Sequence, residues 1–236
     1  MKIFPAIDIR DGKCVRLIKG NYEDEVVFNE DPYDVAKKFE DIGSKYAHII
    51  DLDGAKDGKS TIKHYVEKII NKTNLKIQIG GGIRTFENAE TLLNLGVNKI
   101  IFGTAALENK SDVLKAINKF KSKIIVSIDA LNGKIKTKGW LKESDINLKD
   151  LVIELQENGC ENFIYTDIEK DGTMSHPNFE YISEFRKTCK SELYIAGGIS
   201  NINDVTKLKS IGIDGAILGM SIYTGKIDLK KLLKTI

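Results

Sequence analysis

Cysteine and long apolar runs are both scarce in this chain of 236 residues. The three cysteines, Cys14, Cys160 and Cys189, are odd in number and lack metal-ligand spacing, which argues against a disulfide framework and for reduced thiols. No apolar stretch approaches the ~20 residues that span a bilayer. Pro5 and Asp8 interrupt the apolar N-terminus too early for a signal peptide. We therefore expect a cytoplasmic protein without membrane contact.

An excess of charge of one sign is absent as well. The chain has 36 basic and 34 acidic residues, a formal net charge of +2, so no global field favours nucleic acid as a partner. Its three histidines show no ligand spacing, and no metal site is expected. His48 falls inside an expected strand and should be buried and hydrogen-bonded. No low-complexity linker divides the chain, so we expect one domain over residues 1–236.

What the chain does contain is an internal repeat. The segment 80–84, Gly-Gly-Gly-Ile-Arg, recurs as 196–200, Ala-Gly-Gly-Ile-Ser, at an offset of 116 residues. Four pairs of glycines keep the same offset: Gly43 and Gly159, Gly82 and Gly198, Gly96 and Gly212, Gly103 and Gly219. A second register, offset by 121 residues, pairs Asp8 with Asp129. Two similar halves indicate a duplicated supersecondary unit.

Short apolar, β-branched runs alternate with amphipathic segments along the chain. We expect strands at residues 2–8, 46–52, 76–79, 99–102, 124–129, 162–166, 192–196 and 215–218. We expect helices at residues 32–42, 62–71, 86–95, 112–120, 148–158, 179–188, 202–211 and 229–234. In a duplicated chain this pattern favours an α/β fold, the closed (β/α)8 TIM barrel of two half-barrels, about 1–120 and 121–236, over an open doubly wound sheet. Residues 131–145 are expected to form a long polar loop.

Two aspartates end strands that the repeat makes equivalent. Asp8 ends the first expected strand and Asp129 the fifth, and reactive groups of this fold lie at the carboxyl ends of strands. Facing carboxylates across a pocket can act as a general base and a general acid. The alternative is that each aspartate caps the following loop by accepting backbone N–H bonds. Their symmetric placement favours catalysis.

Glycines follow the other expected strands in the same symmetric way. Glycine lets the main chain approach an anion closely, and backbone N–H groups beside a helix start can bind it. A single such segment would indicate only a tight turn. Two symmetric pairs of glycine segments instead predict a ligand with a phosphate at each end, bound at Gly81, Gly82, Gly103, Thr104, Gly197, Gly198, Gly219 and Met220.

These motifs, in order, resemble those of a known family. The matching segments are residues 5–8, 51–55, 78–84, 103–106, 139–140, 166–173 and 197–200. The chain is similar to the histidine-pathway isomerase family, phosphoribosylformimino-5-aminoimidazole carboxamide ribotide isomerase. The resemblance implies an Amadori rearrangement of a bisphosphorylated sugar, without a cofactor and without an obligatory protein partner.

The resemblance also implies roles for single residues. Asp8 corresponds to the general base that removes the C2′ proton, and Asp129 to the general acid that opens the furanose ring. Thr166 corresponds to a threonine that hydrogen-bonds near the acid, and its repeat partner is Ile50. Other residues within the matched motifs are expected at the substrate: Arg84, Gly172 and Thr173.

Four further positions have two readings each. Trp140, the single tryptophan, either stacks on the imidazole carboxamide or packs against the barrel rim. Arg16 either faces the ligand or is a solvated loop charge, and Asp171 either orients the acid or its loop, or serves a turn. Asp51 either orients the glycine-rich loop or caps its own strand end.

Two positions depart from the family pattern. His176 stands where glycine is common, and Met220 where a basic residue is common after the strand. The second departure leaves backbone N–H groups as the main donors at the second phosphate.

Three other functions remain open at this point. One is the phosphoribosylanthranilate isomerase reaction, alone or as a second activity, on a substrate with one phosphate. Another is the cyclase subunit of imidazole glycerol phosphate synthase, whose family usually opens with Cys-Leu-Asp-Val where this chain has Ala6-Ile7-Asp8-Ile9. The third is a barrel that binds phosphosugars without catalysis.

Overall fold

A closed barrel of parallel strands forms the centre of the computed structural model, which describes residues 1–28, 30–58, 60, 62–131, 134–137, 140, 142–144 and 146–236. Among these residues eight parallel strands neighbour one another around the ring, and β10 pairs with β7 to close it. In ring order they are β1 (Lys2–Arg10), β4 (Tyr46–Asp51), β5 (Lys76–Gly80), β6 (Lys99–Phe102), β7 (Ile124–Leu131), β10 (Asn162–Asp167), β11 (Glu192–Ala196) and β12 (Gly215–Leu218). The predicted TIM barrel is therefore confirmed.

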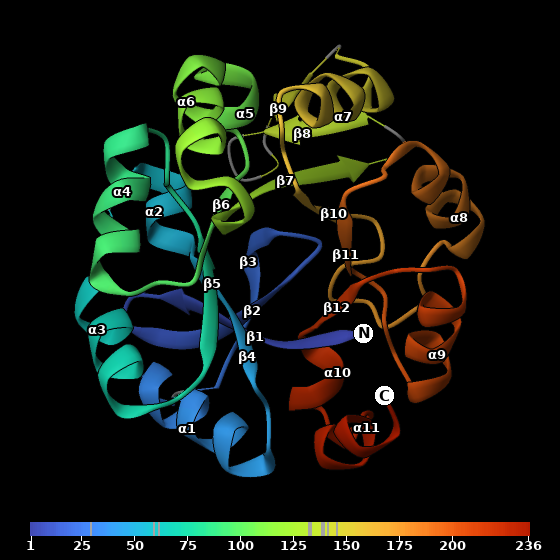
Figure 1. Ribbon diagram of the computed structural model, residues 1–236. Coiled ribbons are helices and arrows are strands. Elements are labelled where there is room, and N and C mark those ends of the chain that lie inside the picture. The colour runs from blue at the N-terminus through green and yellow to red at the C-terminus, as the bar shows by residue number, and fades with distance from the viewer. Residues whose placement is uncertain are drawn as a thin grey trace.

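Helices surround the barrel on all sides (Figure 1). They are α1 (Pro32–Ile42), α2 (Leu52–Asp57), α3 (Lys63–Lys72), α4 (Phe86–Leu95), α5 (Ala105–Glu108), α6 (Lys110–Phe120), α7 (Leu148–Glu157), α8 (Phe179–Thr188), α9 (Ile202–Ser210), α10 (Met220–Tyr223) and α11 (Leu229–Thr235). The eight longer ones match the predicted helices to within about two residues, as expected from how helix ends fray. In the part of the chain that is described, none of them is long and apolar enough to cross a membrane.

Two antiparallel additions were not predicted. A hairpin of β2 (Lys13–Ile18) and β3 (Asn21–Val27) follows β1, so Arg16 lies on a strand and not in a loop. Within residues 131–145, β8 (Lys134–Thr137) pairs with β7, and β9 (Lys142–Glu143) pairs with β8. The prediction of a polar loop was wrong there, because Ile135 and Thr137 are buried while Lys134 is exposed, an alternation typical of a strand.

Buried apolar side chains form two main clusters, one between the barrel and the helices and one inside the barrel. Because neighbouring residues of a strand point to opposite faces, Ile3 and Ile7 pack outward with the helices, whereas Phe4 and Ala6 pack inward. The inward set is apolar and buried: Phe4, Ala6, Ile101, Ile125, Ile164, Tyr194, Ala196 and Ile217. The barrel is thus a packed core and not a pore.

Charged side chains close the amino-terminal end of the barrel. Lys2, Lys99 and Glu192 are the first residues of β1, β6 and β11. Lys2 Nζ lies 2.7 Å from Glu192 Oε2, and Lys99 Nζ donates to the Tyr194 hydroxyl at 3.1 Å. Any ligand must therefore enter from the carboxyl ends of the strands.

The glycine that follows β5 shows how closely the backbone segments pack at the carboxyl ends of the strands. Gly81 has φ +97°, and a Cβ there would overlap the carbonyl oxygen of Asp51, whereas Gly43 has φ +108° and open space around its Cα. We expect Gly43→Ala to lower the free energy of unfolding by about 1 kcal/mol through backbone strain alone. Gly81→Ala should cost about 3 kcal/mol or more, since strain and overlap add. Urea denaturation measures both, and equal losses would contradict this account.

Candidate active site

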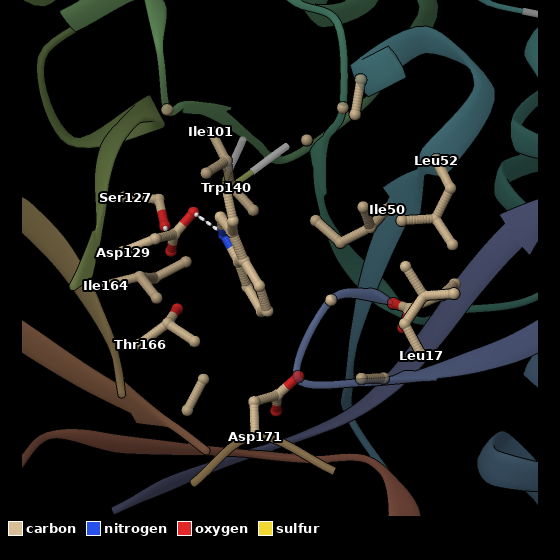
Figure 2. Close-up of a pocket in the computed structure, with 18 of the residues that line it drawn as sticks. Leu17, Ile50, Leu52, Ile101, Ser127, Asp129, Trp140, Ile164, Thr166 and Asp171 are labelled. Carbon is tan, nitrogen blue, oxygen red and sulfur yellow. Dashed lines mark hydrogen bonds between the residues drawn. The ribbon is translucent and has the colours of Figure 1, made fainter. Parts of the chain in front are cut away.

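A cavity of about 460 Å³ opens at the carboxyl ends of the strands. Figure 2 shows side chains from strands on opposite sides of the barrel converging on it. Every strand of the ring contributes to its wall: Asp8, Ile50, Gly80, Ile101, Asp129, Thr166, Ala196 and Ile217. The two repeat-related aspartates therefore face one common space, as the sequence predicts.

Asp8 forms an ion pair with Arg16 in the cavity wall. Arg16 Nη1 lies 2.5 Å from Asp8 Oδ2, Arg16 also donates to the Ala6 carbonyl, and the Arg16 and Asp8 side chains are 9% and 16% exposed. Burial raises the pKa of Asp8, and the opposing charge of Arg16 does not cancel that rise. Arg16 is thus not a solvated loop charge. Its guanidinium also lies against Gly219, where an added Cβ would be 3.0 Å from Arg16 Cζ.

Asp129 is held by two donors on the other side of the cavity. Trp140 Nε1 donates to Asp129 Oδ2 at 2.8 Å, and Ser127 Oγ donates to Oδ1 at 3.0 Å. The Trp140 ring extends into the cavity beside Asp129 (Figure 2). Its other side meets the turn of the β2–β3 hairpin, because a Cβ on Gly20 would overlap the ring. The ring therefore occupies the cavity and does not merely pack on the rim.

Asp171 supplies a third carboxyl group, from the segment between β10 and α8. Burial raises its pKa to about 7, the charges of Asp8 and Asp129 add to the rise, and Arg16 opposes it. The adjoining backbone is anchored to the hairpin, since Lys19 N donates to the Asp171 carbonyl at 3.1 Å. Asp171 is therefore a group of the cavity and more than a turn residue. Thr166, 7% exposed, is the register partner of Asp129 on β10.

The glycine segments adopt the same geometry in both halves. Gly81 and Gly82 have φ values of +97° and +70°, and Gly197 and Gly198 have +92° and +76°. Gly81 lies over the Asp51 carbonyl and Gly197 over the Asp167 carbonyl. Each segment leads into a helix, α4 or α9, and the amino-terminal end of a helix favours an anion nearby. Asp51 itself caps α2, accepting from Gly54 N at 2.8 Å.

The remaining predicted residues divide between the cavity and its surroundings. The cavity is also lined by Arg84, Gly103, Thr104, Gly172 and Met220. Thr173 does not line it. Its hydroxyl donates to the Lys170 carbonyl at 2.7 Å inside a turn.

His176 does not line the cavity. Its side chain bonds to residues at the start of α9. It has φ +67°, a region that favours glycine. Its Nδ1 lies 2.9 Å from Asp204 Oδ1 and 3.1 Å from Ser200 Oγ. These bonds hold His176 in its left-handed backbone conformation.

Sequence reasoning missed some residues of the site. Ser127 lies two positions before Asp129 on one strand, so the strand period could have placed it on the same face. Leu17 and Tyr22 come from the hairpin that was not predicted. No group of three or more His, Cys, Asp or Glu side chains in the described ranges is arranged to hold a metal ion.

The raised pKa of Asp171 predicts a pH-dependent stability. The folded protein keeps this proton up to about pH 7, whereas the unfolded chain releases it near the ordinary value of 3.8. The free energy of unfolding should therefore fall as the pH rises between these values. Asp171→Asn removes that loss, so its Tm should exceed the wild-type Tm at pH 8 but not at pH 3. Glu23→Gln, at an exposed site, is the control. A Tm difference independent of pH would refute the assignment.

Comparison with known proteins gives the same family throughout. A family model described as "Histidine biosynthesis protein" matches residues 2–228. A relative from Ruminiclostridium cellulolyticum is 42% identical over 236 residues, which is 100% of each chain. A relative from Bacillus cereus is 44% identical over 234 residues, 99% of this chain and 98% of the relative. Both are named 1-(5-phosphoribosyl)-5-((5-phosphoribosylamino)methylideneamino)imidazole-4-carboxamide isomerase. This chain belongs to the histidine biosynthesis protein family.

Proposed function

We propose that the protein is an aldose–ketose isomerase of histidine biosynthesis. It converts the N-linked phosphoribosyl-formimino aminoimidazole carboxamide ribotide into its phosphoribulosyl form by an Amadori rearrangement. The observation that carries the proposal is the placement of Asp8 and Asp129 on one cavity between two matching glycine segments. The names of relatives at 42% and 44% identity support the same reaction. We further propose that it acts in the cytoplasm and without a second protein.

The chemistry requires four proton transfers and an electron sink. An acid protonates the ring oxygen, the C1′–O bond breaks, and the nitrogen lone pair forms a protonated imine at C1′. That imine acidifies the C2′ hydrogen, which Asp8 removes to give an enaminol. Return of a proton to C1′ and loss of the hydroxyl proton complete the aminoketose. The substrate supplies its own electrophile, so positioned acid–base groups suffice.

Asp8 suits the role of the base. Its raised pKa makes it a stronger base than an exposed carboxylate. The ion pair with Arg16 fixes the orientation of the carboxylate and leaves one oxygen for the substrate. Two carboxyl groups compete for the role of the acid. Asp129 is the one that the family resemblance implies, and Asp171 has a pKa near 7, which suits an acid near neutral pH.

The two phosphates anchor the substrate across the cavity. The first would lie at Gly81 and Gly82 with the Arg84 guanidinium in the same wall. The second would lie at Gly197, Gly198 and Gly219. There Met220 brings no charge, but Arg16 lies against Gly219 and can supply one. Binding energy from both ends then holds the reacting carbons at Asp8. A substrate with one phosphate, as in the anthranilate reaction, would leave one anion site without a ligand.

Removing either repeat-related carboxylate tests the mechanism. Purified protein should convert the bisphosphorylated aldose, and Asp8→Asn and Asp129→Val should each lower kcat by roughly 10²–10⁴-fold, the usual contribution of an acid or base. Glu180→Gln, an exposed carboxylate on α8, should leave kcat unchanged. Activity on phosphoribosylanthranilate alone would refute the substrate, and unchanged rates in both aspartate variants would refute the mechanism.

The pH profile distinguishes the two candidate acids. If Asp171 is the acid, wild-type kcat falls above about pH 7, and Asp171→Asn loses roughly 10²-fold or more at every pH. If Asp129 is the acid, Asp171→Asn keeps most of its rate at every pH. Initial rates between pH 5 and pH 9 decide between these outcomes.

A further inference from the structure

The ring of Tyr223, the last residue of α10, lies beside the ion pair of Asp8 and Arg16. The Arg16 Cζ atom is 5.1 Å from the centroid of the ring, a distance at which a guanidinium is attracted to an aromatic face. The Tyr223 hydroxyl donates to the Ala6 carbonyl at 3.0 Å, and Arg16 Nη2 donates to the same carbonyl. Tyr223 and Arg16 therefore share one acceptor on the strand that carries Asp8.

The hydrogen bonds of Arg16 leave part of its guanidinium without an acceptor. Nη1 pairs with Asp8 Oδ2 and Nη2 with the Ala6 carbonyl, whereas Nε is buried without a hydrogen-bond partner among the described residues. A buried donor without a partner costs free energy, and other rotamers of the long side chain compete with the paired one. Contact with the ring of Tyr223 stabilises the paired arrangement.

Tyr223 is itself held by two other aromatic rings. Its ring centroid lies 4.5 Å from that of Phe28, and it meets the ring of Phe39 on α1 edge to face at 6.2 Å. Burial raises the pKa of its hydroxyl, so the proton stays in place for the Ala6 carbonyl. The ring does not line the cavity. It can therefore influence a substrate only through neighbours such as Arg16.

The internal repeat supplies a comparison for this arrangement. At the offset of 116 residues Leu107 takes the place of Tyr223, and at the offset of 121 residues Thr137 takes the place of Arg16. Leu107 packs against the same outer core as Tyr223, so an aliphatic side chain suits this position of the fold. The tyrosine and the arginine thus meet beside Asp8, whereas a leucine and a threonine stand at the equivalent places of the other half.

We propose that Tyr223 is a positioning residue for the reaction, which fixes the Arg16 guanidinium in the orientation that aims Asp8 at the C2′ hydrogen of the sugar. This inference rests on the proposed function. Tyr223 also ends the short helix that starts directly after Gly219, and Met220 and Ser221 of that helix line the cavity. A phosphate bound at Gly219 then stabilises the helix that carries Tyr223, so binding of the second phosphate supports the orientation of the base.

Removing the aromatic face while keeping most of the volume tests this role. Tyr223→Leu copies Leu107 and should lower kcat about 30-fold, the effect of one desolvated cation–π contact, with KM within about threefold because the phosphate donors remain. Tyr223→Met should give the same loss, and Tyr223→Phe, which keeps the ring, only about threefold. Ile222→Val, on the same helix but outside the cavity wall, is the control and should lower Tm without changing kcat.

A pH profile separates positioning from a merely structural role. Arg16 opposes the rise in the pKa of Asp8, so a guanidinium that leaves its place raises that pKa further. The pH below which kcat/KM falls should therefore move upward in Tyr223→Leu, by about 0.5 pH units or more. Ile222→Val should keep the wild-type profile.

Nitrogen-15 NMR of the arginine side chains gives a readout besides activity. The two Nη groups of Arg16 should give separate signals in the wild type, since their bonds to Asp8 and Ala6 block rotation about the Nε–Cζ bond, and Tyr223→Leu should merge these signals. Separate signals in the Leu and Met variants, or a kcat within twofold of wild type there, would overturn the inference and leave the proposed function standing. A wild type that does not turn over the aldose would remove the proposed function, and the inference with it.

Discussion

The ion pair of Asp8 and Arg16 connects nearly every part of the site. A single guanidinium contacts the proposed base, the Ala6 carbonyl beneath it, the ring of Tyr223 and the backbone at Gly219. Buried pairs add little net stability, because desolvation offsets their attraction. The value of this pair is electrostatic. The positive charge of Arg16 interacts with both Asp8 and Asp171, two carboxyl groups that would otherwise repel each other, and it opposes the rise in the pKa of Asp171.

Three segments meet above the strands, and they meet through backbone and ring contacts. The hairpin turn at Gly20 rests on Trp140, its Lys19 N–H bonds to the Asp171 carbonyl, and Gly172 lies against the Leu17 carbonyl. None of these contacts depends on a long, flexible side chain. The positions of Trp140 and Asp171 are therefore coupled to the hairpin that carries Arg16, so the base, the aromatic ring and the third carboxyl group share one support.

Much of the fold and part of the site could be predicted from the sequence. Apolar periodicity predicts the helices and barrel strands, and the repeat relates Asp8 to Asp129. Residues 13–18, 21–27, 134–137 and 142–143 were missed as strands because their pairing depends on neighbours and on solvent exposure that the local pattern shows weakly. The pKa of Asp171 could not be predicted, since it depends on how close three carboxyl groups come in space. The hydrogen-bond partner of the buried His48 was equally hidden, because the strand register pairs it with Gln78, thirty positions along the chain.

The network at Lys2, Lys99 and Glu192 has a consequence for how such a protein can diversify. It fastens three strands at the end opposite the chemistry, through contacts that involve no residue of the cavity wall. Loops at the carboxyl ends of the strands can then be lengthened or exchanged, while the contacts at the amino-terminal end keep the strands in register. A barrel built in this way can acquire new substrates through changes in those loops, while the amino-terminal end of the barrel stays unchanged.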